Sequence, residues 1–569
     1  TFSHTPPQRT PSQCALCVCV CIYATLFLSL SLSVCDCVHA SLSLSVCVCV
    51  SVFFGAPSMA TASPLRACTA PLLSVALLCV VVLAGASSAS PALHWFSHGR
   101  IQYSGGRERG VVSGRDTRLL RGPGVALPPQ WYTQQRLNHF DPQDTRTWAQ
   151  RYFVNDQYFS GSGPVFLMLG GEGPISDYFV VNGAMVEYAK RYGALCVTVE
   201  HRFYGKSQPT GDLSNESLKL LSSQQALADA AQFRQYIVQK FGLNDNNKWV
   251  VFGGSYPGSL SAWFRLKYPQ LVVGSIASSA PVEAKTNFVE YYEVVAAALK
   301  ELKNGQQCVD RIKQGFTTIE SKLSSSAGRS ELEKLFQSCD KLETSDDLSN
   351  FVTNVAGNFA GVDQYNRDYR PYSPTFNITI DTLCDVMNSV NDPVAALANI
   401  NDLLMKATSQ KCMPNSYRNM IAEMQNTTLG ESTEAGARQW VYQTCTEFGY
   451  YQSSDSKNQP FGTMFPLSFS LQQCKDIYGS KFTGPDVDWT NTFYGAKNVQ
   501  GTNIVFPNGS VDPWHALGVI ADISPSVTAI FMHGTAHCAN MYQPNPTDLE
   551  TLKQARIKIS DTIGKWLAQ

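Results

Sequence analysis

The chain has 569 residues, enough for more than one hydrophobic core, so we expect at least two structural units. Its formal net charge is −1 and its pI is near 6.7, so there is no electrostatic reason to expect a nucleic acid as a partner. The 18 cysteines are unevenly placed, and ten of them precede residue 80.

The first 58 residues alternate between short Cys-Val and Ser-Leu repeats, and the first residue is Thr1. Repeated TG and TC dinucleotides, read in triplets, encode these pairs. We therefore interpret residues 1–58 as translated simple-repeat DNA upstream of a start at Met59. A membrane anchor within residues 14–53 is the alternative, but serine-rich stretches and the lack of flanking charges disfavour it.

Residues 59–90 have the three parts of a secretory signal peptide. Arg66 supplies the positive charge, PLLSVALLCVVVLAG the apolar core, and ASSAS the small residues of a cleavage zone. The core is short for a spanning helix, so we expect no stable membrane anchor after cleavage. The mature protein is expected in the secretory pathway, either in the endosomal or lysosomal lumen or secreted.

Eight cysteines follow the signal, and six of them lie between residues 308 and 474. An oxidising compartment favours disulfides among these six, although the sequence leaves all 15 pairings open. Cys196, in an apolar strand, and Cys538, beside a histidine, are candidates for free thiols. No cysteine spacing suggests a zinc site, and we expect no metal and no other cofactor. Sequons predict N-glycosylation at three positions: Asn215, Asn377 and Asn426.

Residues 91–130 are rich in glycine and arginine and show no sustained period, which predicts an exposed linker or pro-segment. Further on, near-continuous apolar segments alternate with segments of helical spacing. Strands are expected within 150–155, 164–174, 194–205, 248–254 and 271–281, and helices within 222–242 and 255–269. This alternation is typical of a parallel sheet covered by helices on both faces.

The character of the chain changes near residue 283, and the sequence up to about residue 490 is mostly helical and polar. Strand-like segments return at 502–510 and 526–534. A final helix is expected within 547–569, where Thr547 and Glu550 have the spacing of a capping box. The sequence therefore predicts an α/β domain in two parts, residues 131–282 and 491–569, interrupted by a helical insertion at 283–490.

The stretch VVFGGSYPGSL at 250–260 resembles a nucleophile elbow, although Pro257 stands where the common G-x-S-x-G pattern has glycine. If Ser255 is a nucleophile, an acid and a histidine should follow it, each after a strand. Asp512 and His537 stand at those places. Each residue alone is more often a turn or structural residue, but their joint order and placement predict a catalytic triad.

An acyl intermediate also needs two backbone N–H donors for its oxyanion. One is expected at Tyr256, the residue after the candidate nucleophile. The other is expected in the glycine turn after the 164–169 strand, at Gly171 or Glu172. The carboxylate of Glu172 either contacts substrate or orients the oxyanion hole, or it is an ordinary loop carboxylate, and the sequence does not decide between these.

Eight motifs between Trp131 and Gln569 resemble the prolylcarboxypeptidase-type serine peptidases. They are NHF with W and QRYFVND, GGEGP, EHRFYGKS, LSSQQALAD, GGSYPGSLSAWFRLKYP, ASSAPVEA, NGSVDPWHALG and GTAHC. The resemblance implies an α/β-hydrolase fold whose large helical insertion, or cap, roofs the active site. It also implies hydrolysis of peptide bonds, in the best-known relatives after a proline.

Carried across position by position, the resemblance gives the same triad, Ser255, Asp512 and His537. It identifies Trp514 with a tryptophan that walls the proline pocket, and it makes Gly258 the glycine that the elbow requires. Ser259 departs from the pattern, because the prolyl-cleaving relatives tend to have methionine there. This departure weakens the case for strict proline specificity.

The leading hypothesis is a serine peptidase acting on short peptides, with a preference for cleavage after proline. An esterase, or a catalytically weak hydrolase-fold protein that binds peptides, is the alternative. The sequence leaves open whether peptides are trimmed from the amino end, trimmed from the carboxyl end or cut internally. Homodimers are common among such relatives, and the sequence does not determine whether this chain forms one.

Overall fold

The computed structural model describes residues 127–367, 370 and 373–569, and the backbone of four short strands before them. These strands are β1 (Val18–Cys21), β2 (Cys47–Val50), β3 (His94–Ser97) and β4 (Arg100–Tyr103). The chain forms two units, residues 1–88 and 89–569. In the first unit β1 pairs with β2 antiparallel, and in the second β3 pairs with β4 antiparallel.

The predicted signal peptide and most of the predicted linker lie outside the described residues, so both stay predictions. Within the part of the chain that is described, no helix is both long enough and apolar enough to span a bilayer.

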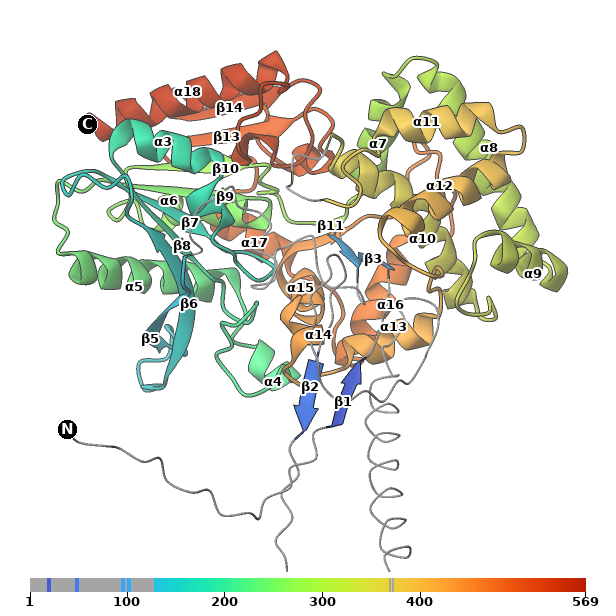
Figure 1. Cartoon of the computed structure of the whole chain (residues 1–569), viewed down its shortest axis with the longest axis horizontal. Coiled ribbons are helices and arrows are strands. Elements are labelled where there is room, and N and C mark those ends of the chain that lie inside the picture. Colours follow the sequence, from blue (N-terminus) through green and yellow to red (C-terminus); the bar gives the residue numbers. More distant parts are fainter. Residues whose placement is uncertain are drawn as a thin grey trace, which may run out of the picture. The chain divides into compact units, whose positions relative to one another are not determined.

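An eight-stranded sheet forms the centre of the second unit, with the order β14-β13-β10-β9-β7-β8-β6-β5 (Figure 1). The strands are β5 (Gln130–Arg136), β6 (Thr147–Asn155), β7 (Val165–Leu169), β8 (Leu195–Val199), β9 (Trp249–Gly254), β10 (Gly274–Ser278), β13 (Ile504–Gly509) and β14 (Val527–Met532). The six strands from β14 to β8 are parallel, as predicted. At one edge of the sheet β6 pairs antiparallel with β8, and β5 pairs antiparallel with β6. A short connection joins β5 and β6 into a hairpin.

Helices cover both faces of this sheet (Figure 1). Helices α3 (Ala184–Tyr192) and α18 (Glu550–Leu567) pack on one face, and α5 (Ser223–Phe241) and α6 (Tyr256–Lys267) on the other. Every residue of β7 is buried because side chains of both faces are covered. Phe166 packs in the core under α3 and α18, whereas Leu167 packs in the core under α5 and α6.

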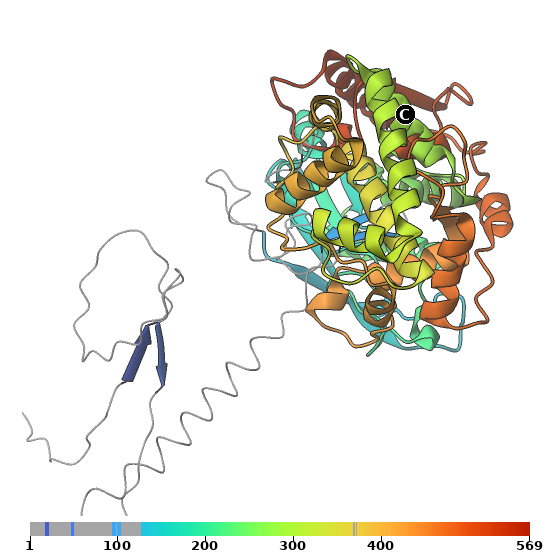
Figure 2. The ribbon, with the colours of Figure 1, turned by 90° about the vertical axis from the view of Figure 1, so that its right-hand side faces the viewer.

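The chain between β10 and β13 is mostly helical, and Figure 2 shows these helices in front of the sheet. The elements are β11 (Lys285–Asn287), α7 (Glu290–Lys300), α8 (Gly305–Leu323), α9 (Ser326–Leu335), α10 (Ser345–Gln364), α11 (Ile380–Ser389), α12 (Pro393–Ala407), α13 (Tyr417–Met424), α14 (Glu431–Glu434), α15 (Ala437–Gln443), the π-helix η1 (Thr444–Phe448), β12 (Gly449–Tyr451), α16 (Leu467–Tyr478) and α17 (Val487–Tyr494). One hydrophobic core runs from β7 through α6 into α10 and η1. The inserted helices are therefore continuous with the core on that face of the sheet.

Three disulfides pair all six cysteines between residues 308 and 474: Cys308–Cys384, Cys339–Cys412 and Cys445–Cys474. Cys196 and Cys538 are buried and carry free thiols. Both predictions about the mature cysteines are thus confirmed, and the fold supplies the pairing that the sequence left open.

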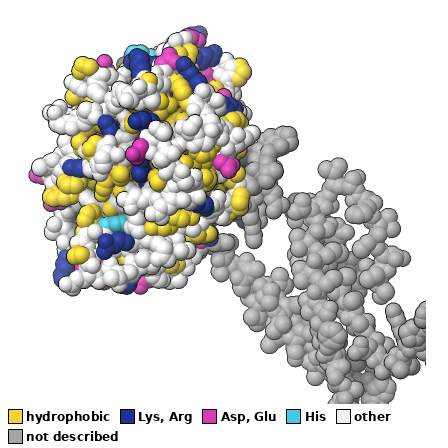
Figure 3. Space-filling view, turned by 90° about the vertical axis from the view of Figure 1, so that its left-hand side faces the viewer, with side chains coloured by type: hydrophobic (Ala, Val, Ile, Leu, Met, Phe, Trp, Pro, Cys, Tyr) yellow, Lys and Arg dark blue, Asp and Glu magenta, His cyan; other side chains and the backbone are white. Residues whose placement is uncertain are grey.

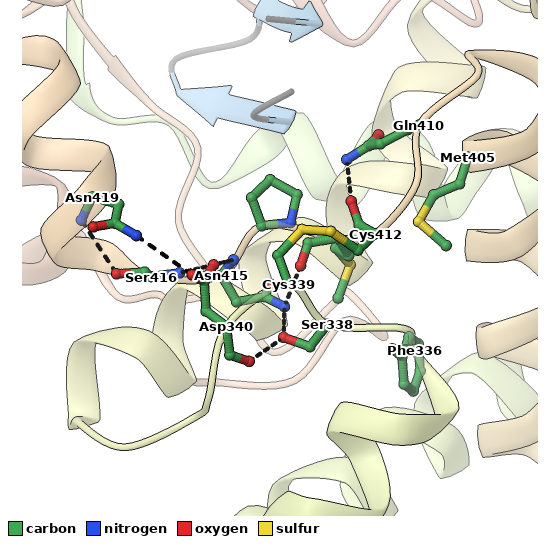
Figure 4. The surroundings of a disulfide bond; sticks show 12 residues. Phe336, Ser338, Cys339, Asp340, Met405, Gln410, Cys412, Asn415, Ser416 and Asn419 are labelled. Carbon is green, nitrogen blue, oxygen red and sulfur yellow. Dashed lines mark hydrogen bonds between the residues drawn. A yellow bond between two sulfur atoms is a disulfide. The ribbon is translucent and has the colours of Figure 1, made fainter. Parts of the chain in front are cut away.

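A network of hydrogen bonds surrounds the Cys339–Cys412 disulfide (Figure 4). The Asp340 carboxylate accepts hydrogen bonds from the backbone N–H groups of Asn415, at 3.0 Å, and Ser416, at 3.1 Å. The Asn415 side chain is fully buried and donates to the Ser338 hydroxyl at 2.8 Å. Disulfide and hydrogen bonds together fasten the segment after α9 to the segment before α13.

The predicted capping box of the last helix is wrong. Helix α18 begins at Glu550 with Leu549 as its N-cap, and no side chain caps it. The Thr547 hydroxyl instead donates to the Asn545 side chain at 2.8 Å, within a turn that precedes the helix. The Thr547 side chain therefore stabilises this turn and does not cap the helix.

Basic and acidic side chains are interspersed on the surface that Figure 3 shows. This mixture agrees with the near equality of 44 basic and 45 acidic residues in the chain. No continuous field of one charge sign covers the described residues on this face.

Candidate active site

Ser255 lies on a sharp turn between the end of β9 and the start of α6. Its backbone has φ 66° and ψ −134°, a conformation that residues other than glycine rarely adopt. The Ser255 N–H donates to the Ser278 carbonyl at 3.0 Å. A Cβ on Gly253 would lie 1.9 Å from the Pro257 carbonyl oxygen, and one on Gly258 would lie 2.5 Å from the Ser278 carbonyl oxygen. The turn therefore needs glycine at both places and accommodates proline between them.

Asp512 and His537 follow β13 and β14, and the structure brings them together. The Nδ1 of His537 is 2.8 Å from Oδ1 of Asp512, and both side chains are buried. The same carboxylate oxygen accepts the Trp514 backbone N–H at 3.0 Å as the N-cap of η2 (Pro513–Leu517). His515 and His533 are near in the sequence, but it is His537 that bonds to the acid.

Two opposing effects act on the pKa of His537. Burial lowers this pKa, but the Asp512 carboxylate and the neighbouring Cys538 outweigh burial and raise the pKa well above its usual value. The carboxylate thus favours the imidazolium form, which is the form that a histidine base takes after it accepts a proton.

The loop that carries His537 is fastened beside the serine turn. Within that loop, the Cys538 N–H donates to the Ser279 hydroxyl at 2.9 Å, and the Asn540 side chain donates to the Ser278 hydroxyl at 2.8 Å. A Cβ on Gly254, the residue before the candidate nucleophile, would lie 2.9 Å from the Cys538 sulfur. The loops after β9, β10 and β14 therefore meet at one edge of the sheet.

The start of α6 and the glycine turn after β7 lie beside Ser255. The Tyr256 N–H begins α6, and among the described residues no acceptor is bonded to it. Gly171 lies against the first turn of the same helix, because a Cβ there would be 2.2 Å from Cγ of Pro257. The glycine turn that includes Gly171 and Glu172 is therefore next to the elbow, and its role as an oxyanion donor stays a prediction.

The inserted helix α10 adds a residue that sequence reasoning missed. The Gln364 carbonyl accepts the His537 N–H at 3.0 Å. Its side-chain oxygen accepts from the Trp514 indole N–H at 3.1 Å and from the Tyr291 hydroxyl at 2.7 Å. No local motif marks Gln364, because its partners lie far away in the sequence and only the fold brings them together.

The neighbouring Asp363 is unusual. It is fully buried, and neither of its carboxyl oxygens has a hydrogen-bond partner among the described residues. Burial and the nearby charge of Asp512 raise the pKa of Asp363 well above its usual value. A carboxyl group in this setting stays protonated unless a positive charge approaches it.

The other predicted site residues lie close to the same centre. Trp514 is buried, with ring contacts to His537 at 6.4 Å and to Tyr291 at 5.8 Å between centroids. Ser259 is fully buried one turn after Ser255, and no partner among the described residues bonds to its hydroxyl.

The three predicted glycosylation sites differ in their surroundings. Asn377 and Asn426 are exposed. The amide of Asn215 is half-buried and bonded on both sides, since its nitrogen donates to the Tyr478 carbonyl at 2.7 Å and its oxygen accepts from Arg438 at 2.9 Å. This geometry disfavours a sugar at Asn215.

The sheet, its two helical layers and the loops gathered at one edge define an α/β hydrolase with a helical insertion. Comparison with known families gives the next step: a model described as Serine carboxypeptidase S28 matches residues 135–559. The chain belongs to this family and is a serine-type peptidase, a hydrolase that acts on peptides.

Curated relatives agree with this membership. A putative serine protease of Caenorhabditis elegans, K12H4.7, is 38% identical over 447 residues, covering 76% of this chain and 87% of the relative. The thymus-specific serine protease of Mus musculus is 35% identical, covering 79% and 89%. The lysosomal Pro-X carboxypeptidase of Homo sapiens is 30% identical, covering 75% and 85%.

Proposed function

We propose that Ser255, Asp512 and His537 form a catalytic triad that hydrolyses peptide bonds through an acyl-enzyme. The observation that carries this proposal is the buried 2.8 Å contact between His537 and Asp512 beside a serine on a strained elbow. A serine hydroxyl becomes nucleophilic when a base removes its proton and a third group orients that base.

The proposed reaction follows from the chemistry of these groups. The Nε2 of His537 takes the Ser255 proton as Oγ attacks the peptide carbonyl, and Asp512 stabilises the imidazolium that forms. The imidazolium then gives the proton to the leaving amine, and the C–N bond breaks. Water, activated by the same histidine, hydrolyses the ester and restores the serine.

The negative oxygen that forms during each attack needs backbone donors. We assign one donor to the Tyr256 N–H, which begins α6 and has no protein acceptor among the described residues. We assign the second to the turn at Gly171 or Glu172, because Gly171 lies directly against the first turn of α6. Helix α6 adds the positive end of its dipole at the same place.

Substrates are proposed to be short peptides, since the inserted helices share one core with the sheet and restrict access for folded proteins. A preference for proline is supported by the aromatic group around Trp514, which includes Tyr291 and lies beside His537. Ser259 has an unbonded hydroxyl one turn after Ser255, where we expect a more apolar side chain in a strict prolyl peptidase, so we expect the preference to be relaxed, not strict.

Asp363 supports trimming from the amino end. A free α-amino group carries a positive charge, which would compensate the buried carboxylate and restore its ionised form. Without such a ligand the Asp363 carboxyl has no partner among the described residues. We therefore propose that the substrate amino terminus binds beside Asp363.

The names of the relatives and the disulfides also bear on the cellular location of the protein. One relative is named as lysosomal, and three disulfides in the insertion fit an oxidising compartment. We propose a secretory-pathway protein that is either lysosomal or secreted. The homodimer stays a prediction, which light scattering of the purified protein would test.

Digestion of a mixed peptide library by the chain expressed from Met59 tests this function, with Ser255→Ala as the matched control. The proposal expects products that vanish in the control, release of short amino-terminal fragments, and enrichment of cuts after proline. Loss of amino-end selectivity in Asp363→Asn would support the amine site. Peptides that bind but are never cut would favour the peptide-binding alternative, and cleavage of esters alone would favour the esterase.

A further inference from the structure

The side chain of Tyr256 is buried between His201 and the insertion. It is 1% exposed, and its hydroxyl oxygen lies 3.0 Å from Nε2 of His201 and 3.0 Å from Nε2 of Gln443. Its ring lies 5.6 Å from Trp440 and 5.3 Å from Phe448 between centroids. The backbone of Tyr256 thus belongs to the elbow, while α15 and η1 surround its side chain.

The direction of each hydrogen bond follows from chemistry. Nδ1 of His201 is 2.8 Å from the Arg202 carbonyl oxygen, which only accepts, so Nδ1 carries the hydrogen. Burial lowers the pKa of His201 to about 4, so the ring is neutral above that pH and its Nε2 is an acceptor. The Tyr256 hydroxyl therefore donates to His201, and its oxygen must accept from Gln443.

The Gln443 side chain both donates and accepts hydrogen bonds. Its amide nitrogen donates to the Tyr256 hydroxyl at 3.0 Å and to the Glu447 carboxylate at 3.3 Å. Its amide oxygen accepts from the Tyr204 hydroxyl at 2.7 Å. An ionised carboxylate could not donate to Tyr256, and an aliphatic side chain would remove the donor that the Tyr256 hydroxyl oxygen accepts from.

The chain also changes geometry at this residue. Helix α15 ends at Gln443, and the π-helix η1 begins at the next residue. Single turns of π-helix occur frequently at functional sites. Here the wider turn stands where the insertion contacts the first turn of α6.

We infer that Gln443 is a positioning residue for the oxyanion hole, because it holds the Tyr256 side chain and thereby fixes the direction of the Tyr256 N–H. This inference rests on the proposed function, in which that N–H is a donor to the oxyanion. Loss of a whole oxyanion donor costs about 10²- to 10³-fold in rate, so a donor that stays in place but is misdirected should cost about 10- to 100-fold.

The test is the second-order rate at which a fluorophosphonate labels Ser255, because this reaction needs the oxyanion donors but no particular peptide. Gln443→Leu and Gln443→Met both remove the amide, and methionine keeps nearly the length of the glutamine side chain. Gln439→Leu is the matched control: Gln439 is equally buried in α15, and its nitrogen donates to the carbonyls of Phe203 and Thr433 without contact to Tyr256. Melting temperatures report the stability of each variant.

We expect both Gln443 variants to be labelled about 10- to 100-fold more slowly, while Gln439→Leu loses comparable stability and keeps its rate. Tyr256→Phe should show a similar loss, and combining it with Gln443→Leu should add little, since both act through one hydrogen bond. Labelling of folded Gln443→Leu at the control rate, or fully additive losses, overturns the inference. Wild-type protein that resists labelling at Ser255 would instead overturn the proposed function.

Discussion

Asparagine in place of Asp512 should keep His537 oriented but remove the charge that stabilises it. Oδ1 of Asp512 accepts from both His537 and the Trp514 backbone N–H. Because a backbone N–H only donates, the asparagine must place its oxygen at the Oδ1 position. The same oxygen then accepts from Nδ1 of His537, so the tautomer that leaves Nε2 free to act as a base is retained.

The expected loss is therefore electrostatic. Unit charges about 4 Å apart interact by about 4 kcal/mol at the effective dielectric constant of about 20 that suits most protein sites. At about 1.4 kcal/mol for each factor of ten, Asp512→Asn should lower kcat by about 10³-fold. A triad in which the tautomer also reverses loses about 10⁴-fold, so the smaller loss is specific to the geometry around Trp514.

The pH dependence gives a second measurement on the same variant. In the proposed mechanism His537 is a base only when neutral, so activity should fall as the pH drops through its pKa. The Asp512 charge raises that pKa, so Asp512→Asn should move the acid limb of the kcat profile to lower pH. His139→Gln is the control, because His139 also contacts a buried carboxylate, that of Asp229, away from the elbow. A loss below tenfold, or an acid limb that stays in place, would refute this role of Asp512.

Two further sets of substitutions test the packing at the elbow and the glycosylation sites. Gly171→Ala places a Cβ 2.2 Å from the ring of the proline in the first turn of α6, so kcat should fall at least tenfold, whereas Gly211→Ala has nothing within 4 Å and should keep wild-type kinetics and melting temperature. Intact-mass measurement should show one glycan lost from each of Asn377→Gln and Asn426→Gln, because both asparagines are exposed. Asn215→Gln should leave the glycan mass unchanged, since that amide is bonded on both sides, and a lost glycan there would contradict the hydrogen bonds described.

The strands that the sequence predicted are those whose side chains are buried on both sides. Strands β7 and β8 read as unbroken apolar runs because helices cover both faces of the sheet. Strand β5 escaped prediction because it lies at the sheet edge, where most of its side chains are not fully buried and their polar character hides the pattern. The antiparallel direction of these edge strands depends on which strands lie next to each other, and the periodicity of hydrophobic residues carries no information on that.

The candidate site residues that come directly after a strand could be predicted from the sequence. Ser255, Asp512 and His537 each follow a recognisable strand, so order and placement made them candidates without the structure. Gln364 and Gln443 could not be found this way, because their importance lies in contacts between α10 or α15 and distant loops. The disulfide pairing was hidden for the same reason.

The most direct test of the triad is to map the residue that a fluorophosphonate labels, by mass spectrometry of peptides from the folded wild-type protein and from His537→Ala. The account predicts one adduct, on Ser255, and its near-complete loss when the histidine is removed. An adduct on another serine, or equal labelling of Ser255 without His537, would contradict the account.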